Sequence, residues 1–406
     1  MKILIVGQGY VGLPLAVEFA EVGCEVFGFD LDKNKIELLL KGNSYIEDVE
    51  SSRIQKLLGA NLYHPIASLE SLPEVDSAII AVPTPLNYKR QPDLSFIQHA
   101  SELLRDNLKS STLIVNESTS YPGTLRDFII PIIESAPINL IFHHYASSPE
   151  RTDPSNSNWN LRNTPRLYSG LTSEASKKTY DLYSKINSRL IEVKSPEVAE
   201  ASKLFENTFR QVNIALVNEL AIICNKLHLN VYDVLEGAAS KPYGFMKFTP
   251  GVGVGGHCIP VDPAYLAFKA ETAGVDAQFI NLASKVNTEM PRMVIDLIGE
   301  KLDREISGLN IVVVGLSYKP NVADTRESPS WNLIELLRKK GNSVSWHDEN
   351  VTSDRGEVSS ELLSGDFDIA IVAIRHDALN QTDVLKSAGI VFDITGTFPE
   401  EFSIFG

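Results

Sequence analysis

Short apolar runs alternate with amphipathic stretches along the first part of the chain, a pattern typical of an α/β protein. The first run, residues 2–6 (KILIV), is apolar throughout, as expected of a parallel strand that is buried on both faces. It stops at Gly7, and residues 13–23 then carry the apolar spacing of a helix. The same pattern predicts further strands within residues 25–30, 75–85, 111–119 and 138–150. Together these elements predict a doubly wound parallel sheet.

The middle of the chain, from about Ser195 to Glu300, loses this strand pattern. Residues 195–229 place apolar side chains three and four positions apart, which predicts one long helix in a mostly helical domain. Such a helix has more apolar surface than one small domain covers, so we expect it to pack against a second copy of the chain. The sequence therefore predicts a homodimer.

The α/β pattern returns in the last part of the chain. Strands are predicted within residues 309–320, 343–349, 367–376 and 389–396. A helix is predicted over residues 328–341, with Ser328 as its N-cap and Pro329 at its first position. We therefore expect two Rossmann-like doubly wound parallel-sheet domains joined by a central helical domain. The predicted domains are residues 1–194, 195–300 and 301–406.

Composition limits the classes of function. The 406 residues are 43% hydrophobic and 22% charged, as in an ordinary globular protein, and no apolar run is long enough to span a bilayer. A formal net charge of -15 argues against nucleic acid and anionic membranes as partners, because both require a basic surface. Three cysteines are too few for a disulfide framework and favour a reducing compartment. We expect a cytoplasmic protein without a metal ion.

Gly7, Gly9 and Gly12 form the sequence GxGxxG between the first predicted strand and its helix. In a dinucleotide-binding turn, the first glycine permits the turn, the second lets the backbone approach a pyrophosphate, and the third lets helix and strand pack closely. Asp30 ends the second predicted strand, where a carboxylate accepts ribose hydroxyls and disfavours a 2′-phosphate. The arrangement predicts NAD as the cofactor, and the alternative is a βαβ unit without ligand.

Residues 251–263 (GVGVGGHCIPVDP) surround Cys258 with glycines. One interpretation is a buried thiol among tight turns, since cysteine behaves as a small hydrophobe. The other is a nucleophile, because a dehydrogenase that carries an aldehyde on to the acid needs a thiolate. The thiolate forms a thiohemiacetal, which is oxidised to a thioester that water hydrolyses.

Other polar residues are candidates for the same chemistry. Lys203 and Asn207 lie four residues apart, on one face of the long helix, and either hold an oxyanion or form a solvated surface pair. Asp262 either acts as a base through water or stands in a turn. Three further candidates follow predicted strands, although each is also suited to a cap or turn: Thr84, Thr119 and Glu150.

A second loop after a strand, residues 315–327, contains Lys319 and Arg326. Because arginine grips phosphate or carboxylate with two parallel hydrogen bonds, the loop is interpreted as a second nucleotide-like site. The alternative is a surface loop whose charges are solvated.

Seven blocks, in this order, resemble the nucleotide-sugar dehydrogenases: GQGYVGLPLA, VPTPL with PDLSF, EST with YPGT, SPER, EASKLFENTFRQVNIALVNELA, PGVGVGGHCIPVDP and YKPNVADTRESPS. The resemblance covers nearly the whole chain. It implies a four-electron oxidation of a sugar C6 hydroxyl to a carboxylate, with two NAD+ and a covalent thioester.

Within that family, GGHCIPVDP is similar to the branch that acts on UDP-N-acetylhexosamines. This favours UDP-N-acetylmannosamine or UDP-N-acetylglucosamine as the substrate and leaves UDP-N-acetylgalactosamine open. The alternatives are a UDP-glucose 6-dehydrogenase and a catalytically idle protein that binds nucleotide sugars. Residues 152–160, after SPER, depart from the family pattern and leave that loop open.

The resemblance also implies roles for individual residues. The implied catalytic residues are Cys258 as nucleophile, Lys203 and Asn207 at the oxyanion, Asp262 and Thr119 at the catalytic water, and Glu150 in thioester hydrolysis. The implied cofactor contacts are Gly7, Gly9, Tyr10, Val11, Gly12, Asp30, Lys35, Thr84, Thr119 and Arg326. The implied substrate contacts are Glu150, Arg151, Lys203, Asn207, Arg210, Phe245, Gly255, His257, Lys319 and Arg326.

Overall fold

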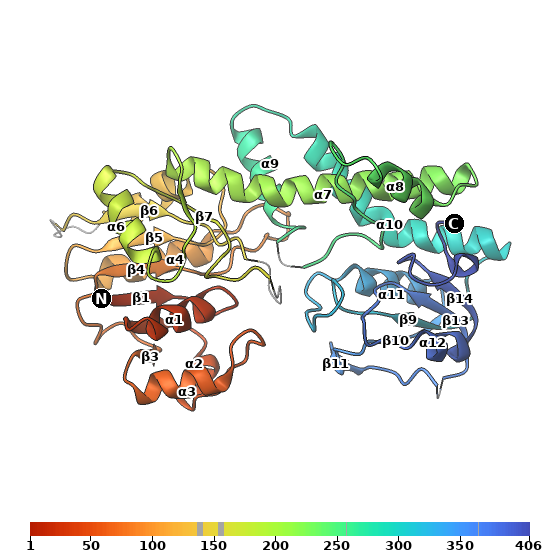
Figure 1. Ribbon diagram of the computed structural model, residues 1–406, viewed down its shortest axis with the longest axis horizontal. Coiled ribbons are helices and arrows are strands. Elements are labelled where there is room, and N and C mark those ends of the chain that lie inside the picture. Colours follow the sequence, from red (N-terminus) through yellow and green to blue (C-terminus); the bar gives the residue numbers. More distant parts are fainter. Residues whose placement is uncertain (136–140, 153–157, 257, 364) are drawn as a thin grey trace. The chain divides into compact units, whose positions relative to one another are not determined.

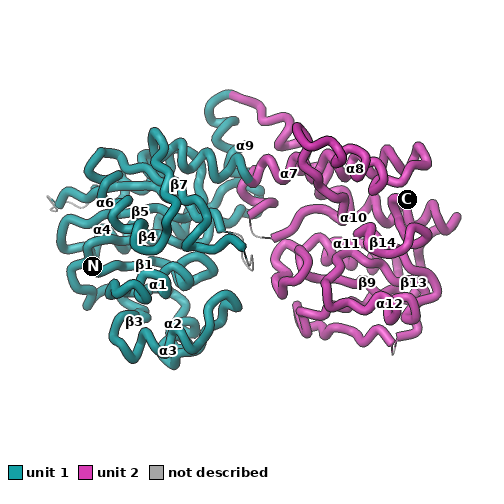
Figure 2. The backbone as a smooth tube through the Cα atoms, in the orientation of Figure 1, with its two compact units in different colours: residues 1–206, 264–274 teal, residues 207–263, 275–406 magenta. Residues whose placement is uncertain are grey.

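The computed structural model describes residues 1–135, 141–152, 158–256, 258–363 and 365–406 (Figure 1). The chain forms two compact units (Figure 2). The first contains Met1–Glu206 and Ala264–Gly274, and the second contains Asn207–Pro263 and Val275–Gly406. The domain boundaries that the sequence predicts, at residues 194/195 and 300/301, stay a prediction.

The described part of the first unit is built around one eight-stranded sheet. Its strands are β1 (Lys2–Val6), β2 (Glu25–Phe29), β3 (Tyr63–Ile66), β4 (Ser77–Ile80), β5 (Leu113–Asn116), β6 (His144–Ser147), β7 (Arg166–Gly170) and β8 (Leu190–Glu192). They lie in the order β3-β2-β1-β4-β5-β6-β7-β8, and all of these neighbours are parallel except β6 and β7. The order reverses between β1 and β4, which is where doubly wound sheets bind ligands.

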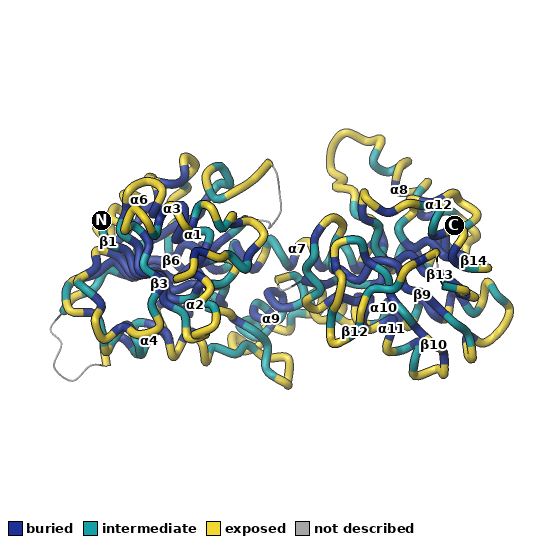
Figure 3. The backbone as a smooth tube through the Cα atoms, turned by 90° about the horizontal axis from the view of Figure 1, so that it is seen from below, coloured by how far each residue is buried: buried dark blue, intermediate teal, exposed yellow. Residues whose placement is uncertain are grey.

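Two hydrophobic cores lie on the two faces of this sheet. The helical elements that begin in the first unit are α1 (Gly12–Glu21), α2 (Lys33–Leu40), α3 (Ser51–Gly59), α4 (Ser95–Asn107), the π-helical turn η1 (Leu125–Ile129), α5 (Ile130–Ile133), α6 (Ser173–Tyr183) and α7 (Pro196–Lys226). Ile3 and Ile5 of β1 pack with α1 and α6, whereas Leu4 and Val6 pack with α4. Burial on both faces explains the uniformly apolar sequence of β1 (Figure 3).

The second unit joins helices and a four-stranded parallel sheet through one hydrophobic core. Its helical elements after α7 are α8 (Val231–Ala239), α10 (Gln278–Leu302), α11 (Pro329–Lys339), α12 (Gln381–Ser387) and the 3-10 turn η2 (Glu400–Phe402). Helix α9 (Asp262–Thr272) begins in the second unit, but most of it belongs to the first. The sheet has the order β10-β9-β13-β14, formed by β9 (Asn310–Val314), β10 (Ser343–His347), β13 (Phe367–Val372) and β14 (Ala388–Asp393), and β11 (Ser353–Asp354) forms a separate hairpin with β12 (Glu357–Val358). Val217 of α7, Val294 of α10 and Val313 of β9 lie in the shared core.

Helix α7 is the long helix that the apolar spacing predicts. It ends where His228 takes a left-handed backbone conformation, with φ of 54°. The amide of Leu229 then donates a hydrogen bond to the carbonyl of Cys224 at 2.9 Å, which closes the last turn as a Schellman motif. Asn230 caps α8 by accepting a hydrogen bond from the amide of Tyr232.

The predicted fold class is confirmed. Along the chain, two mostly parallel α/β sheets precede and follow a segment in which the described residues form helices and no strand. Ser328 caps α11 as predicted, by accepting a hydrogen bond from the amide of Ser330. Among the described residues, no helix has the length and apolar sequence that a membrane crossing requires.

Candidate active site

The turn after β1 contains two glycines that packing requires and one that leaves space for a ligand. Gly7 has φ of +97°, and a Cβ there would lie 2.3 Å from the carbonyl oxygen of Ala81. A Cβ on Gly12 would lie 1.8 Å from the carbonyl oxygen of Gly7. At Gly9, by contrast, no described atom beyond its chain neighbours lies within 4 Å of the Cβ position. This open space fits the approach of a pyrophosphate to the backbone.

Asp30 lines a cavity of about 280 Å³ at the carboxyl ends of β1, β2 and β4. Its carboxylate accepts hydrogen bonds from the amides of Gln8 and Asp32, both at 2.9 Å, and Lys35 Nζ lies 3.5 Å away. The cavity thus brings together four residues that the sequence predicts as cofactor contacts: Gly7, Gly9, Asp30 and Lys35. A carboxylate beside a glycine turn suits the ribose and pyrophosphate of NAD.

The loops after β4 and β5 are joined to each other. Ser118 Oγ accepts a hydrogen bond from the amide of Val82 at 2.8 Å and donates one to the carbonyl of the same residue at 2.9 Å. Because β4 and β5 are parallel neighbours, Thr84 and Thr119 follow strands that end at the same edge of the sheet. The two predicted threonines therefore share the edge that carries the glycine turn.

Glu150 follows β6 and belongs to a buried group of charges. Its Oε1 accepts hydrogen bonds from the amides of Arg151 and Thr152, both at 2.6 Å, and its Oε2 accepts one from the guanidinium of Arg166. Burial opposes the charge of Glu150, but Arg166 and the amide donors outweigh burial and hold its pKa below the usual value. Glu150 is therefore an ionised carboxylate in a fixed orientation at neutral pH.

Glu117 shares the same guanidinium. Its Oε1 lies 3.1 Å from Arg166 Nη1 and accepts a hydrogen bond from the hydroxyl of Tyr183, whose ring centre lies 4.6 Å from the guanidinium carbon. Burial, opposed by Arg166 and reinforced by Glu150, raises the pKa of Glu117 to about 7. One buried arginine thus serves two carboxylates, of which Glu117 retains its proton to higher pH.

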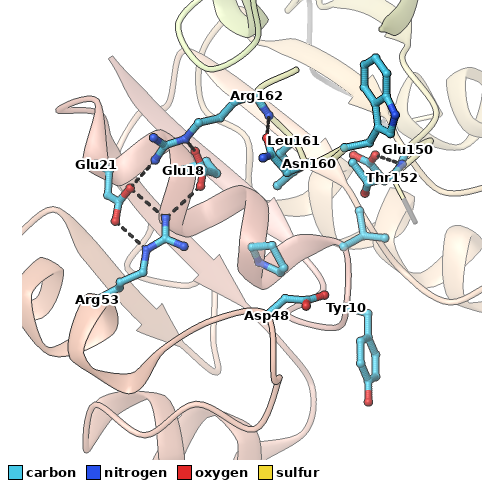
Figure 4. A pocket seen from close by; sticks show the side chains of 13 residues that line it. Tyr10, Glu18, Glu21, Asp48, Arg53, Glu150, Thr152, Asn160, Leu161 and Arg162 are labelled. Carbon is cyan, nitrogen blue, oxygen red and sulfur yellow. Dashed lines mark hydrogen bonds and ion pairs between the residues drawn. The ribbon is translucent and has the colours of Figure 1, made fainter. Parts of the chain in front are cut away.

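Glu150 also lines a cavity of about 430 Å³ together with Tyr10 and Val11, two predicted cofactor contacts (Figure 4). The wall of this cavity contains an ion-paired cluster of four residues: Glu18, Glu21, Arg53 and Arg162. Its nitrogen–oxygen distances run from 2.6 to 2.9 Å. These charges compensate one another, so the cluster holds residues 158–162 against α1 and α3.

Within the second unit, the glycines ahead of Cys258 are explained by close packing. A Cβ on Gly255 would lie 2.8 Å from the carbonyl oxygen of Glu327 and 2.8 Å from the Cβ of Tyr318. Gly256 has φ of +81°, and a Cβ there would lie 2.9 Å from the ring of Tyr318. Bare backbone is therefore needed where this loop lies against the chain after β9.

The contacted chain is the loop of residues 315–327, which carries two predicted ligand contacts. The amide of Gly256 donates a hydrogen bond to the carbonyl of Arg326 at 3.0 Å. The guanidinium of Arg326 donates to both carboxylate oxygens of Asp324, at distances from 2.5 to 3.0 Å. Lys319 lies on the same loop. The structure thus links the cysteine loop directly to the loop with Lys319 and Arg326.

Cys258 is exposed and precedes α9. Its carbonyl accepts a hydrogen bond from the amide of Asp262 at 2.8 Å, and Asp262 Oδ2 accepts one from Asn207 Nδ2 at 2.5 Å. Three predicted catalytic residues are therefore brought together. Lys203 lies one turn earlier on α7, in the part that belongs to the first unit. His257 lies outside the described residues.

The remaining predicted substrate contacts are Arg151, Arg210 and Phe245. The guanidinium of Arg151 pairs with Glu206 at 2.5 Å and donates a hydrogen bond to the carbonyl of Pro165 at 2.7 Å. Arg210 is exposed on α7, and Phe245 is 42% exposed after α8. In this structure Arg151 therefore forms an ion pair with Glu206.

Comparison with known proteins gives one family over most of the chain. The NAD binding domain of the UDP-glucose/GDP-mannose dehydrogenase family matches residues 1–187, its central domain matches residues 197–289, and its UDP binding domain matches residues 312–400. The chain belongs to this family. The predicted resemblance and the prediction of NAD as cofactor are confirmed, and the chain is an NAD-dependent dehydrogenase of the UDP-glucose/GDP-mannose dehydrogenase family.

Relatives in the family match over nearly their whole length. The UDP-N-acetyl-D-glucosamine 6-dehydrogenase of Salmonella typhi is 34% identical, over 99% of this chain and 98% of its own. The UDP-N-acetyl-D-mannosamine dehydrogenase of Methanococcus maripaludis is 33% identical, over 93% of this chain and 86% of its own. The solved structure of the UDP-D-ManNAc dehydrogenase from Pyrococcus horikoshii has a TM-score of 0.88 at 31% identity, covering 98% of this chain and 96% of its own.

The sequence analysis does not identify Glu117, Arg166 and Tyr183, which form the buried group around Glu150. Glu117 lies within the block EST, two positions before Thr119, so the sequence offered a reason to consider it. Arg166 and Tyr183 lie far from Glu117 in sequence and meet it through the fold of the sheet. No spacing rule connects such residues.

We expect Gly255→Ala to destabilise the second unit, because its new Cβ would lie 2.8 Å from the backbone oxygen of Glu327. Overpacking of this kind costs about 1–3 kcal/mol. Gly251→Ala is the matched control from the same loop, since its Cβ would meet no described atom within 4 Å. Denaturant unfolding of both variants measures the difference, and equal stability would contradict the packing assignment.

We also expect the stability of the first unit to fall as pH rises. Burial raises the pKa of Glu117 to about 7 and that of Glu200 to about 8, from a usual value of 4.5. Between pH 4.5 and these raised pKa values, the folded chain keeps protons that the unfolded chain has lost. The free energy of unfolding therefore falls as pH rises through this range.

The measurement is the thermal midpoint of the wild-type protein and of Glu117→Gln, followed from about pH 5 to about pH 8. The variant should show a shallower fall, because the amide does not ionise. Glu70→Gln, at an exposed carboxyl, is the control and should keep the wild-type slope. An unchanged slope in Glu117→Gln would show that Glu117 does not titrate in this window.

Proposed function

We propose that this protein oxidises the C6 hydroxyl of a UDP-N-acetylhexosamine, either UDP-N-acetylmannosamine or UDP-N-acetylglucosamine, to the carboxylate. The observation that carries the proposal is the exposed thiol of Cys258, in a loop that packs on residues within the UDP binding domain. An enzyme that only interconverts alcohol and carbonyl has no use for a thiolate there. The names of the relatives support the choice of sugar.

Cys258 is the proposed nucleophile. Bound NAD+ accepts one hydride in each of two oxidation steps. The thiolate adds to the C6 carbonyl carbon of the aldehyde and forms a thiohemiacetal, and loss of the second hydride leaves a thioester. Water then cleaves the carbon–sulfur bond, which releases the carboxylate and returns the thiol. Two NAD+ are thereby reduced for each sugar oxidised.

Five other predicted side chains suit the charges that develop in these steps. Lys203 and Asn207 are proposed to hold the oxyanion of the thiohemiacetal. The hydrogen bond between Asn207 and Asp262 supports this role, because it fixes which way the amide points. Asp262 and Thr119 are proposed to hold the hydrolytic water. Glu150, an ionised carboxylate in a fixed orientation, is proposed to accept a proton during hydrolysis.

Ligand contacts are proposed on both units. The proposed NAD contacts are Gly7, Gly9, Tyr10, Val11, Gly12, Asp30, Lys35, Thr84, Thr119 and Arg326. The proposed nucleotide-sugar contacts are Glu150, Arg151, Lys203, Asn207, Arg210, Phe245, Gly255, His257, Lys319 and Arg326. The open space at Gly9 and the cavity beside Asp30 support the first set, and the packing of Gly255 against the loop of Lys319 supports the second.

A second candidate substrate is UDP-glucose, because the family model itself covers UDP-glucose dehydrogenases. Epimer choice depends on a few hydroxyl contacts that no residue pattern in this chain distinguishes. A binding protein without catalysis is the other alternative, and such a protein gains nothing from an exposed thiol in this loop.

We expect the purified protein to release two NADH for each molecule of UDP-N-acetylmannosamine or UDP-N-acetylglucosamine consumed. The measurement follows NADH absorbance with a panel of UDP sugars and identifies the product by mass. Turnover with UDP-glucose alone would transfer the assignment to the second candidate. One NADH per sugar, with free aldehyde as product, would contradict the thioester mechanism.

Cys258→Ser supplies the matched test within this prediction. The variant should still bind NAD+ and UDP but release little NADH in steady state, because a serine hydroxyl is a weak nucleophile. Cys224→Ala, which removes a thiol from the hydrophobic core, is the control and should keep turnover. Normal turnover of Cys258→Ser would return the thiol to a packing role.

We also propose a homodimer formed through α7, working in the cytoplasm. Exposed apolar side chains follow one another along α7 at spacings of four and seven residues: Phe205, Phe209, Leu216 and Ile223. Leu227, four residues further on and directly after the helix, is exposed as well. These spacings place them on one side of the helix, and their exposure supports a second copy of the chain as the occupant. Cys24 and Cys224 are buried outside any disulfide, which supports a reducing compartment.

Light scattering should therefore give twice the chain mass of 44.8 kDa. Leu216→Glu places a charge on a side chain that is 61% exposed in the single chain and should produce monomers. Val358→Glu, at an exposed apolar residue of β12, is the control and should leave the dimer intact. A wild-type monomer at micromolar concentration would remove the proposal.

A further inference from the structure

The loop after β9 is held by one buried carboxylate. Asp348 follows β10, and its Oδ2 accepts hydrogen bonds from the amides of Leu316 and Ser317 at 2.7 and 3.0 Å and from Ser317 Oγ at 2.9 Å. Its Oδ1 accepts hydrogen bonds from two amides of the following turn. Burial opposes the charge of Asp348, but hydrogen bonds from His376 and these amides keep its pKa well below the usual value.

His376 lies on this carboxylate and is 1% exposed. Its Nε2 is 3.0 Å from Asp348 Oδ2, while its Nδ1 accepts a hydrogen bond from the backbone amide of Asn321 at 2.8 Å. A backbone amide can only donate, so Nδ1 is unprotonated and the ring proton sits on Nε2, where Asp348 accepts it. Nε2 also lies 3.0 Å from Ser317 Oγ, and Nδ1 also accepts a hydrogen bond from Asn350 Nδ2 at 2.8 Å. Nδ1 is the nitrogen that binds the loop at Asn321.

Asn321 is the residue of the loop after β9 whose amide donates a hydrogen bond to His376. Its backbone is left-handed, with φ of 62°, a conformation that asparagine adopts more readily than most residues with a side chain. Its side chain exchanges two hydrogen bonds with Asp377, both at 2.9 Å, and its amide is bound by His376. These three bonds hold Asn321 in this conformation, two residues after Lys319.

The same loop is held at its other end by the cysteine loop. Tyr318 packs on the bare backbone of Gly255 and Gly256, and the carbonyl of Arg326 accepts the amide of Gly256. Lys319 lies between Tyr318 and Asn321 along the chain. Its backbone is therefore fixed on one side by the glycines and on the other by His376.

We propose that His376 is a positioning residue for the nucleotide sugar, acting through its Nδ1 acceptor on Asn321 to hold the segment 318–321 that presents Lys319. This inference rests on the proposed function, in which Lys319 contacts the UDP sugar. His376 does not touch the ligand in this assignment. Its effect reaches the ligand through the backbone of the loop, so it should change binding of the uridine nucleotide more than the chemical steps.

Two substitutions separate the two ring nitrogens. His376→Asn keeps an acceptor, its Oδ1, near the position of Nδ1, but it loses the donor to Asp348. His376→Gln keeps a donor near the position of Nε2 but loses the acceptor for the amide of Asn321. The probes are UDP alone, titrated into the full-length protein by calorimetry, and the steady-state kinetics with the UDP sugar. Hydrogen exchange of residues 318–324 without ligand reports the order of the loop directly.

We expect His376→Gln to bind UDP about tenfold more weakly, the factor that one net hydrogen bond represents. KM for the UDP sugar should rise by a similar factor while kcat and NAD+ affinity stay near wild type, and exchange at residues 318–324 should speed up. His376→Asn should keep UDP affinity within about threefold, because it keeps the acceptor. Asp377→Ala, at an exposed position that spares the core, removes the carboxylate that accepts from Asn321 Nδ2 but keeps the backbone amide that donates to Asn321 Oδ1. It should weaken UDP binding in the same direction.

Wild-type UDP affinity and wild-type exchange in His376→Gln would overturn the inference and leave the proposed function standing. A larger loss in His376→Asn than in His376→Gln would also overturn it, because the donor to Asp348 would then be the important contact. A wild-type protein that binds neither UDP nor a UDP sugar would overturn the proposed function itself. Faster exchange in His376→Gln would then still show that His376 orders the loop, without a ligand to position. If both His376 variants fail to fold, Asp377→Ala with wild-type UDP affinity would overturn the inference.

Discussion

The close approach of bare backbone at Gly255 and Gly256 to Tyr318 and Glu327 is the constraint on which the second unit's part of the site depends. No side chain fits between the two loops, so their relative position is set by contact rather than by flexible groups. Cys258 follows one loop, and Lys319 and Arg326 lie on the other. A shift of the loop after β9 would therefore carry the cysteine loop with it. Under the proposed function, this contact joins substrate recognition to the placement of Cys258.

Charge is distributed in a way that suits an acidic protein with anionic ligands. The formal net charge is -15, yet NAD and UDP sugars both carry phosphates. Arg53 and Arg166 of the first unit are engaged by carboxylates, Arg53 by Glu21 and Arg166 by Glu150. The backbone amides at the glycine turn suit a phosphate without any net positive charge.

Much of the fold was predictable because it follows from periodic burial. The apolar run of β1 predicts that both faces of this strand are buried. The three- and four-residue spacing of α7 predicts a helix with one buried face. The edge strands were missed for a physical reason: β3 contains Pro65, and β8 is largely exposed, so neither shows the pattern of a buried strand.

Candidate site residues could be proposed from the sequence where they stand close together or in a known block, as Cys258 and Asp262 do. Residues that act through tertiary contacts were not predictable. Glu117 and Arg166 pair across the fold, and His376 reaches Asn321 from a distant strand end. Their chemistry depends on burial and on distances that no local pattern encodes.

The dependence of the cysteine loop on the loop after β9 has a consequence for the order in which the protein is made. During synthesis, residues 251–258 leave the ribosome before residues 315–329, against which the glycines pack. Until that later segment has been translated and β9 has joined its sheet, the backbone ahead of Cys258 has no surface to hold its shape. In a nascent chain the loop ahead of Cys258 therefore lacks its packing partner, and its arrangement arises only after residues 315–329 have been made.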